Sequence, residues 1–319
     1  MIAVLCGGVG AARFLTALSA VADPSATVAI VNTGDDTVLH GLAISPDLDT
    51  VTYTLAEAID RERGWGLAGE TWTAMEALQR YSAVRPDGSA AAPTWFNLGD
   101  RDLATHFYRT ARLAEGATLS EVTAEIATAW DVRHRLVPMS NQTVATRVTL
   151  SGGEEVSFQE YFVKLHHDVD VRSIRFEGAA RAALAPGLAD VLANADCIVI
   201  APSNPLVSIG PIRALPGVDD LLARRRSSVV AVSPIVGGAA LKGPADRMMR
   251  ELGHEASVVG VARIYTAVAA TLVIDPVDSW AVEAIEQHGM RAVVTPSVMS
   301  SPEVGAALAA ATLRAASVQ

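Results

Sequence analysis

Three carboxylates near the end of the second predicted strand are the residues in this sequence best suited to chemistry. Asp35 and Asp36 follow the apolar run Thr27–Val31, and Asp49 comes a short loop later. Open α/β sheets bind ligands outside the carboxyl ends of their strands, so these side chains are expected at a ligand-binding edge. Clustered carboxylates beside a phosphate site indicate Mg²⁺, because without a cation they would repel the ligand. Two plainer alternatives are a solvated acidic loop and, for Asp49, the cap of a helix that starts there.

A glycine-rich turn near the start of the chain could bind phosphate. The apolar run Ile2–Cys6 predicts a buried strand, Gly7, Gly8 and Gly10 follow, and the apolar stretch 11–21 predicts a helix. Glycines let the backbone approach an anion, and the free N–H groups of a helix start favour negative charge. The pattern departs from a nicotinamide-binding fingerprint, because Arg13 replaces the third glycine and Asn32 replaces the ribose-binding acid. A dinucleotide-dependent dehydrogenase is therefore a weaker alternative.

Small and polar residues also follow two later predicted strands. Ser203 and Asn204 come after the apolar run 197–201, and the segment Pro234–Gly238, with Gly237 and Gly238, comes after the run 229–232. Such loops suit a second half of a nucleotide site, although tight turns alone would also explain their prolines and glycines.

These elements predict the fold class: an α/β protein with a Rossmann-like, mostly parallel sheet and helices on both faces. The runs 272–274 and 291–294 predict short final strands, and 143–150 with 156–163 predicts a β-hairpin joined by residues 151–154. Helical patterns at 70–81, 103–113 and 119–130 predict a helical insertion, about residues 55–135, that covers the ligand edge. We expect one domain over residues 1–319, and solvated side chains at His166, His167, Asp168 and Asp170.

The composition narrows the class of function. The 319 residues carry a net charge of −10, which argues against nucleic-acid and anionic-membrane partners. Cys6 and Cys197 lie in apolar runs and are expected to be buried thiols, as is typical of a reducing cytoplasm. The sequence has neither a signal peptide pattern nor an apolar run long enough for a membrane span. We expect a cytoplasmic protein, with a homodimer as the default assembly.

Eight segments together resemble a known family, and they run in order from Leu5 to Ala245. They are CGGVGAARFL, NTGDD, SPDLDTVTYTL, LGDRDLATH, LVPMSNQTVATRV, FQEYFV, PSNPLVSIGPI and SPIVGGAALKGPA. The sequence resembles the 2-phospho-L-lactate transferase family of deazaflavin coenzyme (F-420) biosynthesis, including its actinobacterial phosphoenolpyruvate transferase branch. Single motifs are modest, but eight in register are specific.

The resemblance implies a reaction and its substrates. The terminal ribityl hydroxyl of a deazaflavin, Fo, attacks a three-carbon acid activated by GDP, and GMP leaves. The acid is phospholactate or phosphoenolpyruvate; the alanine-rich composition, typical of a GC-rich genome, favours enolpyruvate. A non-catalytic nucleotide-binding regulator of the gluconeogenesis-factor type is the alternative function.

The resemblance also implies roles for individual residues. The deazaflavin contacts fall on Asp49 and Arg101, and Asp49 with Asp36 would be the catalytic pair and the Mg²⁺ ligands. The nucleotide would lie along Gly7, Gly8 and Gly10, with Ser203, Asn204, Gly237 and Gly238 nearby. We predict that Asn204 binds the guanine base, because its amide both donates and accepts hydrogen bonds.

Overall fold

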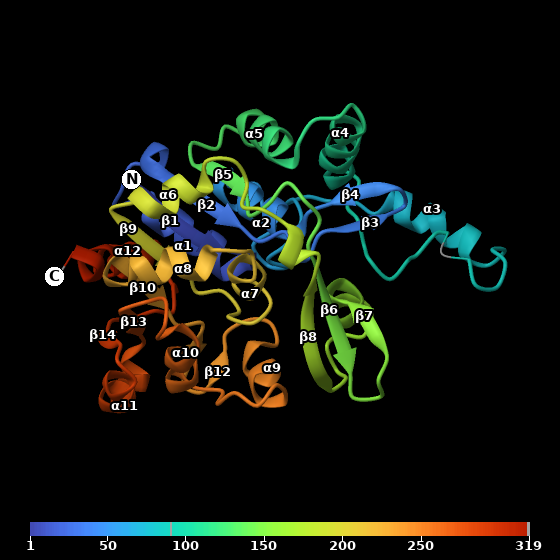
Figure 1. Ribbon diagram of the computed structural model, residues 1–319. Coiled ribbons are helices and arrows are strands. Elements are labelled where there is room, and N and C mark those ends of the chain that lie inside the picture. The colour runs from blue at the N-terminus through green and yellow to red at the C-terminus, as the bar shows by residue number, and fades with distance from the viewer. Residues whose placement is uncertain (90, 318–319) are drawn as a thin grey trace.

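The computed structural model describes residues 1–89 and 91–317, and its centre is a seven-stranded parallel sheet (Figure 1). The strands of this sheet are β1 (Ile2–Cys6), β2 (Thr27–Val31), β5 (Arg135–Pro138), β9 (Cys197–Ile200), β10 (Val229–Val232), β13 (Thr271–Ile274) and β14 (Arg291–Val294). Six of the seven were predicted from apolar runs, and β5 was missed.

The strand order places a topological switch point beside the first strand. The order is β14-β13-β10-β9-β1-β2-β5, so β1 pairs with β2 on one side and with β9 on the other. Ile2 of β1 is in register with both Thr27 and Cys197. In doubly wound sheets the crevice at such a point, outside the carboxyl ends of the strands, is where ligands bind. The glycine turn after β1 and the Ser203 loop after β9 flank this crevice.

Helices cover both faces of the sheet, which confirms the predicted fold class (Figure 1). In the described part of the chain the α-helices are α1 (Gly8–Leu18), α2 (Pro46–Leu55), α3 (Thr73–Ser82), α4 (Asp102–Ala114), α5 (Leu119–Ala129), α6 (Leu188–Asn194), α7 (Gly210–Arg213), α8 (Val218–Arg224), α9 (Ala245–Glu251), α10 (Val258–Tyr265), α11 (Val282–Gln287) and α12 (Pro302–Ser317).

Alternate residues of β1 enter two different cores, as expected of a strand buried on both sides. Val4 and Cys6 pack with side chains of α1, α2 and α12, whereas Ala3 and Leu5 pack with α6, α7, α8 and α10. Cys6 and Cys197 are buried free thiols, as predicted, and burial raises the pKa of the Cys197 thiol to about 12.

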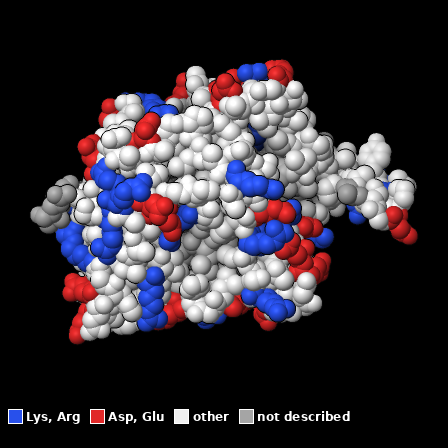
Figure 2. Space-filling view, viewed as in Figure 1, with Lys and Arg blue, Asp and Glu red and all other residues white. Residues whose placement is uncertain are grey.

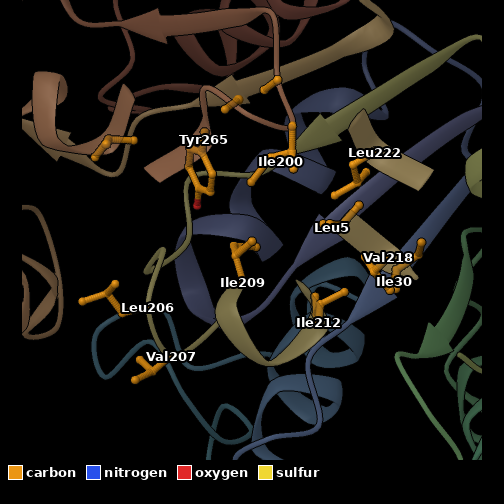
Figure 3. Close-up of a cluster of buried hydrophobic side chains, with 14 of the residues drawn as sticks. Leu5, Ile30, Ile200, Leu206, Val207, Ile209, Ile212, Val218, Leu222 and Tyr265 are labelled. Atoms are coloured by element: carbon orange, nitrogen blue, oxygen red, sulfur yellow. The ribbon is translucent and has the colours of Figure 1, made fainter. Parts of the chain in front are cut away.

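Figure 3 shows part of the second core, beneath the loop that follows β9. The labelled side chains come from the strands, from the 202–212 segment, from α8 and from α10: Leu5, Ile30, Ile200, Leu206, Val207, Ile209, Ile212, Val218, Leu222 and Tyr265. The apolar residues of the 202–212 segment anchor its backbone to the sheet, so the polar residues at its start are held at the switch point.

Three smaller antiparallel sheets stand apart from the central one. The strands β3 (Thr37–Leu39) and β4 (Leu42–Ile44) form a hairpin, as do β11 (Ile235–Val236) and β12 (Ala239–Ala240). The predicted hairpin is present as β6 (Ala145–Leu150) and β7 (Glu155–Ser157), but a third strand, β8 (Val171–Glu177), pairs with β6. The predicted continuation of the second hairpin strand to 163 is wrong, because residues Glu160–Lys164 form a π-helical turn.

Four short 3₁₀ turns complete the regular structure of the described residues: Pro24–Ala26, Ala179–Arg181, Arg226–Ser228 and Pro276–Ala281. The described chain contains no helix with the length and apolar character that crossing a bilayer requires.

The predicted helical insertion is present as α3, α4 and α5. Thr118 caps α5 in a capping box with Glu121. In Figure 1, α5 lies above the β2–β5 end of the sheet, α4 lies above the β3–β4 hairpin, and α3 projects away from the body. The assignment of all residues to one domain stays a prediction.

Charged side chains on the face seen in Figure 2 lie beside charges of the opposite sign. On the three-stranded sheet β7-β6-β8, the outer sheet, Arg175 pairs with Glu155 and Glu177, and Arg147 also pairs with Glu177. These ion pairs offset the charges of the arginines on the outer sheet.

His134 gives the fold a testable pH dependence. Its imidazole is buried before β5 and its Nε2 lies 3.1 Å from Ser19 Oγ at the end of α1. Burial, with Arg133 nearby, lowers the pKa of His134 from 6.5 to about 4. Below pH 6.5, His134 is therefore protonated in the unfolded chain but stays neutral in the folded chain. The free energy of unfolding decreases as the pH falls from 6.5 toward 4.

We expect His134→Gln to lose less thermal stability than the wild type between pH 7 and pH 5, because glutamine carries no titrating group. Melting temperatures of both proteins at the two pH values measure this. A difference between the two proteins that stays constant with pH would contradict the assignment.

Candidate active site at the switch point

The acidic loop after β2 is buried rather than solvated. Asp35 is 6% exposed and Asn32 is fully buried, with the Asn32 side-chain oxygen accepting from the Gly34 amide at 2.8 Å. The outer sheet fixes the loop from the other side: the Thr146 amide donates to Gly34 O at 2.7 Å, and Gln159 Nε2 donates to Asp35 O at 3.3 Å. The alternative of a freely solvated acidic loop is therefore wrong.

A carboxylate of the protein itself fills the start of the glycine turn. Asp47, in the first turn of α2, accepts from Asn32 Nδ2 at 2.9 Å and from the Gly8 amide. A Cβ on Gly7 would lie 2.5 Å from Asp47 Oδ2, and Gly8 has a left-handed φ of +73°. The glycines at these two positions thus make room for Asp47, and an incoming phosphate cannot occupy the same place.

Three carboxylates gather beside this turn with incomplete hydrogen bonding. Burial raises the pKa of Asp35 and of Asp36 well above their ordinary values, and Asp47 adds to both shifts. Burial also raises the pKa of Asp47 to about 6. Among the described side chains, Asp35 Oδ1 and Asp36 Oδ1 are buried without a hydrogen-bond partner. Unpartnered carboxylate oxygens are the donors that a hard cation such as Mg²⁺ requires.

Asp49 is held by an arginine that was not singled out in the sequence. The carboxylate accepts from both terminal nitrogens of Arg109 on α4, with Nη1 at 3.2 Å from Oδ2. Both side chains are nearly inaccessible, with 8% and 2% of their surface exposed. The alternative that Asp49 caps its helix is wrong: Ser45 is the N-cap residue, Pro46 starts α2, and Asp49 lies in the first turn after them.

A buried histidine continues this network. His106 Nδ1 lies 3.3 Å from Arg109 Nη1, which can only donate, so Nδ1 accepts and Nε2 carries the proton. Nε2 faces Asp102 Oδ2 at 3.4 Å, and Tyr53 donates to the other oxygen of Asp102 at 2.5 Å. Within the described chain, His106 Nε2 makes no hydrogen bond at this separation, and the contacts of Arg109 with both oxygens are what fix the plane of the Asp49 carboxylate.

Asp49, Asp102 and His106 are also close enough together to suggest a metal site within the described chain. Arg109 argues against a cation among these three, because its guanidinium already supplies the positive charge to Asp49 and hydrogen-bonds Ala43 O at 3.3 Å. Asp36 is separate from this group: it accepts from Ser45 Oγ at 2.8 Å, and Arg109 and Asp49 both influence its pKa.

Arg101 lies at the N-cap position of α4 with an exposed side chain. Its Nη1 donates to Ala68 O at 2.5 Å, and its backbone amide donates to Glu70 at 2.9 Å. The guanidinium is therefore attached to the 57–72 loop through Nη1, and the rest of this exposed side chain is accessible to a ligand. Arg101 and Asp49 lie on the same side of the fold because α4 carries Arg101 at its start and Arg109 two turns later.

Ser203 and Asn204 bind the protein's own backbone. The Ser203 hydroxyl donates to Gly7 O at 2.9 Å and accepts from Gly7 N at 3.3 Å, so it joins the ends of β1 and β9. Asn204 Oδ1 accepts from the amides of Leu206 and Val207. The oxygen of Asn204 is thus already engaged, and its NH₂ group contacts Met248 Sδ at 3.9 Å. A contact of Asn204 with guanine stays a prediction.

Gly237 and Gly238 form the two-residue turn of the β11–β12 hairpin. Their φ values of +60° and +81° are those that a type I′ turn requires. The Gly237 amide donates to Asp278 Oδ2 at 2.9 Å. A structural requirement therefore accounts for both glycines, and their place in a nucleotide site stays a prediction.

The structure thus brings Asp36, Asp49, the glycine turn and Ser203 to one edge, and it adds Asp47, His106 and Arg109. One signal for the additions was present in the sequence: positions 102, 106 and 109 share a face of one helix. The partner of Arg109 lies sixty positions earlier, and helical spacing alone cannot reveal it.

The chain is similar to known transferases over nearly its whole length. The family described as 2-phospho-L-lactate transferase CofD matches residues 2–299. The chain is 43% identical over 312 residues to a phosphoenolpyruvate transferase of Streptomyces griseus, which covers 97% of this chain and 96% of that protein. It is 40% identical over 334 residues to the phosphoenolpyruvate transferase of Mycolicibacterium smegmatis, with 99% of both chains covered.

Among solved structures, a UPF0052-family protein of Bacillus halodurans has a similar fold. The TM-score is 0.59 at 14% sequence identity, over 96% of this chain and 97% of that chain. At this identity the likeness concerns the fold alone.

Proposed function

This chain belongs to the 2-phospho-L-lactate transferase CofD family, and from that premise we propose its substrates and the roles of its residues. It is a transferase of the phosphoenolpyruvate or phospholactate type. The proposed acceptor is the ribityl hydroxyl of the deazaflavin Fo, and the proposed donor is the three-carbon acid linked through a diphosphate to guanosine. The observation that carries the proposal is the gathering of Asp36, Asp47 and Asp49 beside the glycine turn at the switch point.

In the proposed reaction, the hydroxyl oxygen of Fo forms a bond to the phosphorus that carries the three-carbon acid. The bond from that phosphorus to the bridging oxygen breaks, and GMP leaves with the electron pair. The hydroxyl proton passes to a carboxylate, for which we propose Asp49. Arg109 donates to both oxygens of Asp49 and fixes its orientation, which leaves the remaining lone pairs for the proposed acceptor.

The acidic residues beside the turn suit the Mg²⁺ that we propose as cofactor. The unpartnered oxygens of Asp35 and Asp36 supply hard donors, and Asp47 lies next to them. We propose Asp36 as a ligand, with Asp49 contributing through a remaining lone pair. When bound, Mg²⁺ would offset negative charge on the transferred phosphoryl group. Arg101, with its exposed side chain, is proposed to bind the deazaflavin ring.

For the three-carbon acid we propose enolpyruvate. Two bacterial relatives at 40% identity or more are named phosphoenolpyruvate transferases. Mass analysis of the product tests this choice directly, because the enolpyruvate and lactate products differ by two hydrogens. A product with the lactate mass would overturn it.

Ligand-dependent heat stability tests the nucleotide part of the proposal. GDP with Mg²⁺ at about 100 times its Kd should stabilise the protein by about 2.7 kcal/mol and raise the melting temperature. NAD should leave the melting temperature unchanged, since Asn32 stands where a dinucleotide site has its acid. The opposite pattern would favour an oxidoreductase.

Titration of Fo fluorescence separates the enzyme from a nucleotide-binding regulator. The wild type is expected to bind Fo, and Asp49→Ala to bind it more weakly. A wild-type protein that binds GDP but not Fo would favour the regulator.

A further inference from the structure

This chain builds almost all of its cations from arginine. Of its 25 basic residues, 23 are arginines and only Lys164 and Lys242 are lysines. Lys164 lies 3.6 Å from Glu160 on the same helical turn. Lys242 has no ion pair or hydrogen bond within the part of the chain that the structure describes, so its charge is uncompensated.

Lys242 reaches the switch point from a distant part of the sequence. It lies in the loop between β12 and α9. Gly237 before this loop and Gly243 within it have positive φ values, as is typical of turns. Its Nζ would lie 2.7 Å from a Cβ built on Gly64, and the methyl groups of Val9 lie 3.8 Å from the same point. Val9 belongs to the first turn of α1, so three segments meet there: the glycine turn, the 57–72 loop and the Lys242 loop.

The nearby arginines are paired with the protein or, in the case of Arg101, assigned to the deazaflavin. Arg109 binds Asp49, Arg101 donates to Ala68 O, and Arg63 pairs with Asp60 and packs over two tryptophan rings. At the same time Asp35, Asp36 and Asp47 make this edge acidic. A diphosphate that binds here needs a cation that is free to contact it.

We propose that Lys242 binds the donor phosphate that carries the three-carbon acid, which corresponds to the β-phosphate of GDP. The inference rests on the proposed function. Asp47 excludes a phosphate from Gly7 and Gly8, so the diphosphate lies farther along the turn, beside Val9. The 57–72 loop that Lys242 approaches also holds Arg101, which places Lys242 on the acceptor side of the nucleotide. A lysine ammonium is a compact charge with three donors, suited to a phosphate whose oxygens change position during transfer.

Binding of GDP and GMP to wild type, Lys242→Gln and Lys164→Gln, measured by calorimetry, tests this assignment. We expect Lys242→Gln to weaken GDP binding about 10- to 100-fold, the usual worth of a hydrogen bond between charged groups, and GMP binding only a few-fold. Lys164→Gln should match the wild type for both nucleotides, and Lys242→Arg should retain part of the GDP affinity.

The outcomes separate the two proposals. If the wild type binds GDP and Lys242→Gln binds it equally well, the role of Lys242 is wrong while the proposed function stands. An equal loss of GDP and GMP affinity would overturn the assignment to the β-phosphate. A wild type that binds no GDP would overturn the proposed function, and the role of Lys242 with it. Because Lys242 is exposed, the variants are expected to melt at the wild-type temperature.

Discussion

Replacing Asp49 with asparagine is expected to lower the rate of transfer by a factor of about 10² to 10⁴, the usual contribution of a positioned general base. Asparagine keeps the shape of the side chain and an oxygen for one nitrogen of Arg109, but it cannot take up the acceptor proton. GDP affinity should stay within a few-fold of the wild type, because the proposed nucleotide contacts lie on the glycine turn and Lys242. Single-turnover rates and GDP calorimetry on the same preparations measure both quantities.

The control for this variant is Asp190→Asn, which changes an exposed aspartate on α6, on the other face of the sheet. It should transfer at the wild-type rate. If Asp49→Asn lost GDP affinity and transfer to the same extent, Asp49 would act only through the metal of the nucleotide and would not be the base for the acceptor hydroxyl.

The second large effect concerns stability. Arg109→Met removes the cation that lies between Asp49 and Asp36, and it leaves a buried carboxylate uncompensated. Removing one partner of a buried ion pair lowers the free energy of unfolding by about 3–5 kcal/mol. Urea unfolding should therefore show a midpoint well below that of the wild type. The double variant Asp49→Asn with Arg109→Met should recover part of this loss, because no unpaired charge remains at position 49.

Arg112→Met provides a matched control on the same helix. Arg112 pairs with Glu115 and Glu125 at a partly exposed position, where such pairs contribute about 1 kcal/mol or less. A loss of stability in Arg109→Met no larger than that in Arg112→Met would mean that the Arg109 pair does not hold the site together.

Among the strands that were predicted from sequence, β1, β2, β9, β10 and β13 are buried on both faces. In β1, β2, β9 and β10 nearly every residue is apolar, because helices cover both sides of a parallel sheet. The missed strands lack this signal. The edge strand β5 begins with Arg135 and ends with Pro138, and β8 turns Arg172 and Arg175 to the surface, so neither reads as an apolar run.

The sequence predicted individual residues of the site, but not the contacts between them. The positions of Asp36 and Asp49 at a strand end followed from the apolar run before them and from the family resemblance. Their partners did not, because Arg109 and Asp47 reach them only through the packing of α4 and α2 against the sheet. The homodimer and the cytoplasmic location remain predictions.

The outer sheet has a consequence for motion in the molecule. Two hydrogen bonds, from Thr146 N to Gly34 O and from Gln159 Nε2 to Asp35 O, tie this sheet to the backbone of the acidic loop. Any hinge movement of β6, β7 and β8 must therefore either break these bonds or carry Asp35 and Asp36 along. Movement of the outer sheet is in this way coupled to the positions of the two carboxylates. Protection of the Thr146 amide against hydrogen exchange measures how often its bond to Gly34 O opens.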